Sequence, residues 1–327
     1  MKRLLILLAA LALVAAACGD DDSSDTTGAA PGTTAPSGDK ETITFVVNPW
    51  TASALNVAVA AQLVEEQLGY PTDVITIDEN EAMFTGLADG TLDAVLEIWP
   101  SGITDTEQAF FDDGTVENLG GLGAIGKIGW FVPQYVLDER PEMATWEGLA
   151  TPEAAEYFAT AETGDKGRFL GTDPSYSQYD ELIIENLGLP FEVIFSGSEP
   201  ATVAELDARA ATKDPVIMYW WTPTAAVGKY DLVNVKLPEF TPECGASGAA
   251  ADADVACDYP EDPIFKAVSA KLKDKAPDVY EFLKAFTITN ADQLEMLPPA
   301  EIDGEDVEDV AADWIAAHED AWKAWIP

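Results

Sequence analysis

Three tryptophans stand where their side chains could do chemistry. Trp50 lies in NPW, Trp99 in EIWP and Trp221 in MYWWTP. Each follows a stretch that predicts a β-strand, and each lies within two residues of a proline. A tryptophan that packs in a core usually lies inside an element, so three at strand ends favour a shared cleft. For any single one of them, core packing is an equally good interpretation.

Aromatic faces in one cleft suit a cation that cannot donate hydrogen bonds. A trimethylammonium group has a spread charge and an apolar surface, so ring quadrupoles attract it while a carboxylate satisfies it poorly. Each face contributes roughly 0.5 to 2 kcal/mol. Three or four faces could therefore supply micromolar affinity, which corresponds to about 8 kcal/mol. The tryptophans thus point to a site for a small quaternary-ammonium ligand.

The segments before Trp50 and Trp99 alternate between strand and helix patterns. We predict strands at 41–47, 73–77 and 94–98, and helices at 52–68 and 81–89. Such alternation indicates parallel βαβ units and an α/β fold. Ligands in open parallel sheets bind beyond the carboxyl ends of the strands, where Trp50 and Trp99 both fall.

The rest of the chain suggests a second lobe and a return to the first. We predict helices at 152–160, 179–187 and 202–211, and strands near Phe169, at 192–195 and at 216–221. A strand from about 229 could lead back, followed by helices at 263–272, 277–286, 291–297 and 307–325. Lobe 1 would then hold 41–130 plus 229–327 and lobe 2 would hold 131–228. Two crossings between lobes would create one central cleft.

The N-terminus reads as an export signal. Lys2 and Arg3 precede an apolar run from Leu4 to Val14, then three alanines and Cys18. The run is too short for a membrane-spanning helix, which needs about 20 apolar residues. The pattern resembles a bacterial lipobox, so we expect residues 1–17 to be cleaved and Cys18 to carry the lipid. The alternative is ordinary secretion. Residues 18–40, rich in Gly, Asp, Ser and Thr, predict a flexible tether.

Charge and cysteine content narrow the partners. The net charge of −42 repels nucleic acid phosphates and argues against nucleic acid as a partner, although a general solubility or high-salt adaptation explains much of it. Cys244 and Cys257 flank a Gly/Ala/Asp-rich stretch, which in an oxidising compartment predicts a loop-closing disulfide. With no histidine beside them, we expect no metal and no cofactor.

Six motifs carry a family resemblance over nearly all of residues 41–327. They are NPWTAS at 48–53, EEQLGYPTDV at 65–74, GLADGTLDAVLEIWP at 86–100, GTDPSYSQYDELI at 171–183, DPVIMYWWTP at 214–223 and WIAAHEDAWKAW at 314–325. The second and third are specific, and the others are weaker singly. On these motifs the chain resembles the glycine betaine, choline and proline betaine binding proteins of ABC importers.

The resemblance implies a two-lobed periplasmic-binding-protein fold of type II, working with an ABC permease in the membrane. It implies an aromatic box made by Trp50, Trp99, Tyr135, Tyr176 and Trp221. Asp173 is the carboxylate expected closest to the cationic head.

One departure from the family pattern bears on the ligand. Several betaine-binding relatives carry a histidine where this chain has Thr224 and Ala225, which favours choline or another cation without an acid group. Backbone amides near Ala52 or Ser53, at a helix N-terminus, could still hold a carboxylate.

Three alternatives stay open on the sequence. The ligand could be carnitine, ectoine or another compatible solute, or the protein could be a sensor or adhesion lipoprotein of the same fold. A secreted hydrolase would need the single histidine, His318, which shares a predicted helix face with three tryptophans and has no nucleophile-elbow motif. The acids Glu97, Asp180 and Glu199 could also lie near the cleft. We expect a binding protein and not an enzyme.

Overall fold

The computed structural model describes residues 40–244 and 254–327. The predicted signal peptide, Cys18 and the tether before Lys40 lie outside the described residues. All elements below belong to one unit, Lys40–Pro327.

The described strands form one mixed sheet of nine members. They are β1 (Ile43–Val47), β2 (Thr72–Thr76), β3 (Ala94–Ile98), β4 (Val116–Pro133), β5 (Gly167–Gly171), β6 (Phe191–Phe195), β7 (Ile217–Thr222), β8 (Leu232–Val235) and β9 (Glu261–Ser269). Their order is β2-β1-β3-β9-β4-β7-β5-β6, with β8 paired to β4. The pairs β1/β2, β1/β3, β5/β6 and β5/β7 are parallel, as the βαβ prediction requires.

Helices connect and cover these strands. The α-helices are α1 (Thr51–Leu63), α2 (Glu81–Asp89), α3 (Asp105–Asp112), α4 (Gln134–Glu139), α5 (Trp146–Leu149), α6 (Pro152–Phe158), α7 (Asp180–Asn186), α8 (Glu199–Thr212), α9 (Ala225–Lys229), α10 (Leu272–Lys275), α11 (Pro277–Ala285), α12 (Asn290–Pro298), α13 (Val307–Ala317) and α14 (Glu319–Trp322). Short 3-10 or π turns are η1 (Val64–Leu68), η2 (Pro100–Gly102), η3 (Pro141–Ala144), η4 (Pro242–Cys244) and η6 (Pro299–Asp303). No helix within the described ranges combines the length and hydrophobicity that crossing a membrane requires.

The first βαβ unit follows directly from its sequence. β3 is buried along its whole length, as a central strand covered on both faces should be, whereas the edge strand β2 is largely exposed. Asn80 caps α2 by accepting hydrogen bonds from the backbone amides of Ala82 and Met83. Gly90 ends α2 in the left-handed conformation, with φ 79°. The predicted strand and helix positions up to residue 98 are therefore confirmed to within about two residues.

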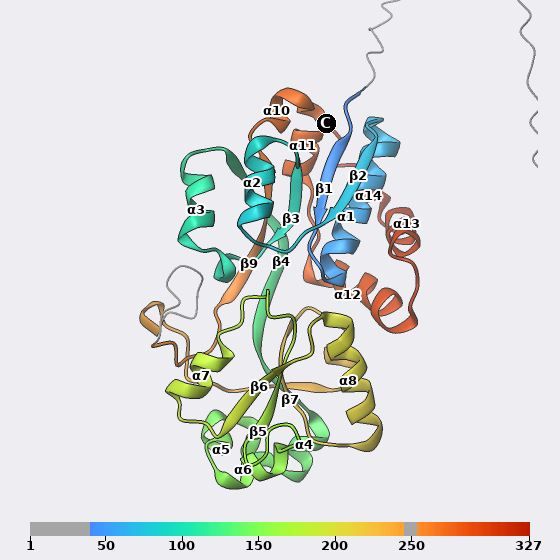
Figure 1. The fold of residues 1–327 in the computed structure, drawn as a ribbon. Helices are drawn as coiled ribbons and strands as arrows, with labels where there is room; N and C mark the ends of the chain where they lie inside the picture. The colour runs from blue at the N-terminus through green and yellow to red at the C-terminus, as the bar shows by residue number, and fades with distance from the viewer. Residues whose placement is uncertain (1–39, 245–253) are drawn as a thin grey trace, which may run out of the picture. The chain divides into compact units, whose positions relative to one another are not determined.

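β4 is the longest strand, and sequence reading did not identify it. Its first part, from Val116 to Lys127, pairs with β9, and the residues from Lys127 to Phe131 pair with β7 (Figure 1). Five glycines interrupt its apolar residues, so neither period of two nor continuous hydrophobicity is visible in the sequence. One strand therefore joins the β1–β3 part of the sheet to the β5–β7 part.

Buried side chains divide along β4. Up to Ala124 its apolar residues pack with β1, α1 and the C-terminal helices, and from Ile128 onward they pack with β5, β7 and α8. A smaller group around Met83 and Phe84 covers the other face near β3. We call the group built on β1 and α1 the first core and the group built on β5 and β7 the second core.

The chain returns to the first core later than expected. Buried residues on both sides of the undescribed segment, from Tyr230 to Leu237 and from Val255 to Tyr259, pack in the second core, and β8 pairs with the end of β4 there. The return runs along β9, which pairs with both β4 and β3. The strand expected to lead back from about 229 therefore closes the second core, because its apolar residues match the neighbouring face of β4.

β9 also replaces a predicted helix. Residues 263–272 were expected to be helical, but Glu261–Ser269 is a strand with a buried run from Ile264 to Ser269. A short, mostly apolar segment is compatible with a buried strand or a buried helix, and the elements that pack beside it decide between the two. Likewise, the helix expected at 307–325 is broken at His318, whose ring stacks on Trp314 with centroids 4.5 Å apart.

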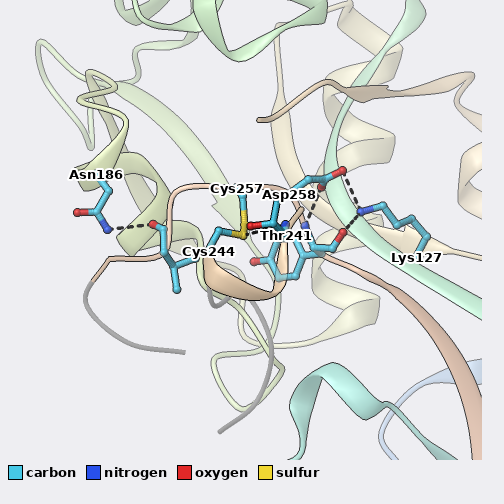
Figure 2. The surroundings of a disulfide bond; sticks show 8 residues. Lys127, Asn186, Thr241, Cys244, Cys257 and Asp258 are labelled. Carbon is cyan, nitrogen blue, oxygen red and sulfur yellow. Dashed lines mark hydrogen bonds and ion pairs between the residues drawn. A yellow bond between two sulfur atoms is a disulfide. The ribbon is translucent and has the colours of Figure 1, made fainter. Parts of the chain in front are cut away.

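Cys244 and Cys257 form a disulfide in the second core, with Cα atoms 6.1 Å apart (Figure 2). Nearby, the Asn186 amide donates to the Val255 carbonyl at 2.9 Å. The Lys127 ammonium pairs with the Asp258 carboxylate at 2.9 Å (Figure 2). These contacts tie the residues on either side of Cys257 to α7 and to β4.

Candidate functional site

A pocket lies where the carboxyl ends of β1 and β3 meet β7. It holds about 490 Å³ of space between atoms, part of it open to solvent, and five aromatic side chains line it. They are Trp50, Trp99, Tyr176, Tyr219 and Trp221. Four of them were predicted site residues, and the structure brings those four together. Trp50 and Trp99 each contact both the first core and the second core, so the pocket lies between the two cores.

Three of the rings stand as consecutive walls. Trp50 and Tyr176 have centroids 5.6 Å apart and planes at 86°. Tyr176 and Trp221 have centroids 5.8 Å apart and planes at 80°. Walls at near right angles present faces and edges to a common space, which is how rings can surround a compact group rather than stack on a flat one. Trp220 stacks behind Trp221 at 4.4 Å and supports it from the core side.

Trp50 is oriented by a buried carboxylate. Its indole N–H donates to Glu97, which also accepts from the side-chain amides of Asn56 at 2.7 Å and Gln293 at 2.8 Å. Burial raises the pKa of Glu97, while these three donors act in the opposite direction. Glu97 lies in β3, two residues before Trp99, so β3 supplies the acceptor for Trp50 and leads directly into Trp99.

Trp99 is held through its backbone amide and through its ring. Its backbone N–H donates to the Glu79 carboxylate, with N–O distances of 3.2 and 3.3 Å. Its ring lies against Gly126 of β4, where an added Cβ would come within 2.3 Å of a ring carbon. Only glycine leaves room for the indole here. Burial is the largest cause that raises the pKa of Glu79 well above its usual value, and Glu107, Asp262 and Glu97 add to it.

Alanine at Gly126 is therefore expected to displace the Trp99 ring and weaken ligand binding about tenfold, which corresponds to about 1.4 kcal/mol. Titration calorimetry with choline measures the effect. Gly228→Ala is the matched control, because an added Cβ there meets nothing within 4 Å. Equal affinity in both variants would show that the close approach of Trp99 to β4 has no role in binding.

Tyr176 is held by the turn that begins at Asp173. The Asp173 carboxylate accepts from the Ser175 amide at 2.9 Å, and its carbonyl accepts from the Tyr176 amide at 3.0 Å. The Tyr176 hydroxyl then donates to the Pro49 carbonyl at 2.7 Å. Asp173 is not among the residues that line the pocket. It shapes the loop that carries Tyr176, although we expected it beside the cationic head.

The predicted box residue Tyr135 lies outside the pocket. Its hydroxyl donates to the Asp214 carbonyl at 2.8 Å, and it is not among the described residues that line the pocket. The reason is the length of β4. Ile128 lines the pocket, β4 continues for roughly 16 Å from there to Pro133, and Tyr135 follows in α4.

Sequence reasoning missed several lining residues. Asp78 and Glu79 follow the end of β2, at the same sheet edge as Trp50 and Trp99. The rule that ligands bind beyond the carboxyl ends of parallel strands could have found them. Tyr219 lies two residues before Trp221 and therefore faces the same side of β7. Ser175 and Ser177 flank Tyr176 in its loop.

Two more carboxyl groups join the cores beside the pocket. Glu199, at the start of α8, accepts from the Thr51 amide at the start of α1 at 3.1 Å. Glu301 accepts from the Ala225 amide at 2.8 Å. Burial, with Glu301 nearby, raises the pKa of Glu199 to about 8, and burial raises the pKa of Glu301 to about 7. Asp180 lies deeper, under Trp130 and Tyr259, where burial raises its pKa to about 7.

Comparisons with known proteins agree on one family. The model of the substrate-binding domain of ABC-type glycine betaine transport systems matches residues 41–317. The trimethylamine N-oxide-binding protein of Pelagibacter ubique (strain HTCC1062) is 24% identical over 290 residues, covering 86% of this chain and 90% of that protein.

Solved structures of similar shape show the fold. Lactococcal OpuAC, closed on glycine betaine, has a TM-score of 0.65 at 21% identity, covering 88% of this chain and 100% of that one. An ABC-transporter choline-binding protein in complex with choline has a TM-score of 0.64 at 20% identity, covering 87% and 91%. The predicted α/β fold of the type II periplasmic binding proteins is confirmed.

Proposed function

This chain belongs to the family of substrate-binding domains of ABC-type glycine betaine transport systems, and we propose that it captures a methylated ammonium solute in an aromatic cage. Trp50, Trp99, Tyr176 and Trp221 form the cage, with Tyr219 beside them. The family binds small quaternary-ammonium ligands and hands them to an ABC permease, so the protein works outside the cytoplasm. The cage is the feature that this chain's own residues add to that general role.

One observation carries the proposal: aromatic rings from both cores line the same pocket. Trp50 and Trp99 follow β1 and β3, whereas Tyr176 and Trp221 belong to the second core. Rings at near right angles would surround a trimethylammonium head on several sides, and each face contributes roughly 0.5 to 2 kcal/mol. Relatives whose names specify glycine betaine, choline and trimethylamine N-oxide bind compounds that share this head group.

We further propose that the two cores are two lobes that close on the ligand. The first lobe holds the β1–β3 region and the C-terminal helices, and the second holds the β5–β7 region with β8. The chain passes between them along β4 and β9. The cage is complete only when rings from both lobes meet, so ligand binding and closure are coupled. Closure excludes water and strengthens the cation–π attraction.

Titration calorimetry tests the ligand class directly. Choline, glycine betaine, proline betaine, carnitine, ectoine and trimethylamine N-oxide are titrated into the purified protein, together with tetramethylammonium as a bare head group. At least one methylated ammonium compound is expected to bind with micromolar affinity or better. Binding of ectoine alone, or of none of them, would rule out the cage.

We also propose that the protein is anchored to the membrane through a lipid on Cys18. The small residues before this cysteine and the polar segment after it support the proposal. Cys18→Ser is expected to move the protein from the membrane fraction to the soluble fraction, with ligand affinity unchanged. Fractionation followed by immunoblotting measures this. A variant that stays with the membrane would indicate another form of attachment.

A further inference from the structure

The charged groups among the described residues that line the pocket are all acidic. Asp78 and Glu79 line it, and among the described residues the lining includes no lysine, arginine or histidine. Within the same described lining, the other polar side chains, apart from the tyrosines and the indole N–H groups, are the hydroxyls of Ser175 and Ser177. A ligand carboxylate would therefore find no cationic partner among the described lining residues.

The helix end nearest the cage is also occupied. α1 begins at Thr51, immediately after Trp50, and a helix N-terminus favours an anion. In this chain the Thr51 amide already donates to Glu199, whose side chain is 4% exposed. The Thr51 hydroxyl lies 3.5 Å from the other oxygen of the same carboxyl group. The Thr51 amide, next to the amides near Ala52 and Ser53 that we expected as a carboxylate site, thus already has the protein's own acid as its partner.

Further acids lie behind Glu199. Glu301 and Glu97 both act on it electrostatically, and Glu199 in turn acts on the Tyr176 hydroxyl of the cage. The carboxyl group of a ligand placed against α1 would be an additional acidic group in this cluster. A ligand carboxylate buried there without a cationic partner loses its hydration without full replacement, so such a ligand loses affinity.

We propose that the pocket selects methylated ammonium ligands that carry no carboxylate group. The inference rests on the proposed function and narrows it: choline-type cations and trimethylamine N-oxide fit, whereas glycine betaine, proline betaine and carnitine are disfavoured. Glu199 is a specificity-determining residue, because it occupies the Thr51 amide at the start of α1. The lack of a cationic side chain among the described lining residues acts in the same direction.

The dissociation constants from the titration of the purified protein decide the matter. Choline or trimethylamine N-oxide is expected to bind at least tenfold more tightly than glycine betaine. Glycine betaine binding as tightly as both, or more tightly, overturns this inference and leaves the aromatic cage intact. Failure of every methylated ammonium compound, tetramethylammonium included, overturns the proposed function as well.

A substitution isolates the role of Glu199. Glu199→Ala removes the acid from α1, so the preference for choline over glycine betaine is expected to fall at least threefold. The ratio is the readout because loss of the contact between Glu199 and Thr51 can weaken both ligands together. Glu185→Ala, an exposed acid on α7, is the control and keeps the wild-type ratio. If Glu199→Ala does not fold, Glu199→Ser, which shortens the side chain, is measured with the same expectation, and an unchanged ratio overturns the role of Glu199.

Discussion

Alanine at Trp99 or at Trp221 is expected to weaken binding of choline or a related ligand at least tenfold. Each substitution removes one aromatic face of the cage, and a face is worth on the order of 1.4 kcal/mol or more where water is excluded. The two residues come from different cores, so each variant tests one half of the cage. Calorimetry or quenching of intrinsic tryptophan fluorescence by the ligand measures both dissociation constants.

A tryptophan outside the pocket serves as control for these variants. Trp146, in α5, is half-buried against the second core and does not line the pocket. Trp146→Ala is expected to lower stability somewhat while leaving the dissociation constant unchanged. Wild-type affinity in both Trp99→Ala and Trp221→Ala would count heavily against the cage, because two of its walls would then contribute nothing.

Loss of the Glu97 carboxylate is expected to have the largest effect on folding. Glu97→Ala leaves three donors without their partner: the Trp50 indole N–H and the amides of Asn56 and Gln293. Removing one member of a buried polar network costs about 3 to 5 kcal/mol. At about 2 to 4 °C per kcal/mol, this lowers the melting temperature by roughly 10 °C. Thermal unfolding followed by circular dichroism measures the change.

Binding and stability should respond together in this variant, because Glu97 orients Trp50. Glu97→Gln keeps one acceptor oxygen, so we expect a smaller loss of stability than in Glu97→Ala. Glu66→Ala, at an exposed position in η1, is the surface control and should lie within about 0.5 kcal/mol of wild type. A melting temperature of Glu97→Ala equal to that of the control would show that the three donors find other partners.

Local patterns were most informative where one element follows another in a βαβ unit. β1, α1, β2, α2 and β3 appear in the order and nearly at the positions that the sequence predicts. Their strands end at the same edge of the sheet, so Trp50 and Trp99 could be assigned to one site from chain position alone. The same rule about strand ends also places Asp78 and Glu79, after β2, at this edge. They were not singled out in the sequence because the chain contains many other acidic residues.

Predictions were wrong where a segment's partners, rather than its own residues, decide its conformation. The run from Ile264 to Val268 is buried without a clear hydrophobic period, since Lys266 interrupts it, and it becomes a strand because β3 and β4 flank it. The family resemblance included Tyr135 in the box, but the length of β4 carries this residue away from the pocket. Neither the strand conformation of β9 nor the position of Tyr135 can be predicted from the local sequence.

The sequence by itself determined which residue types were available for binding and the sheet edge at which the first of them would lie. It also supplied the cysteines of the disulfide and the acidic character of the chain. Only the tertiary structure decided that Tyr176 stands between Trp50 and Trp221, that Gly126 makes room for Trp99, and that Glu199 covers the start of α1. The physical reason is that these contacts join residues far apart in the chain. Their energies depend on distance and burial, which local propensity and spacing do not encode.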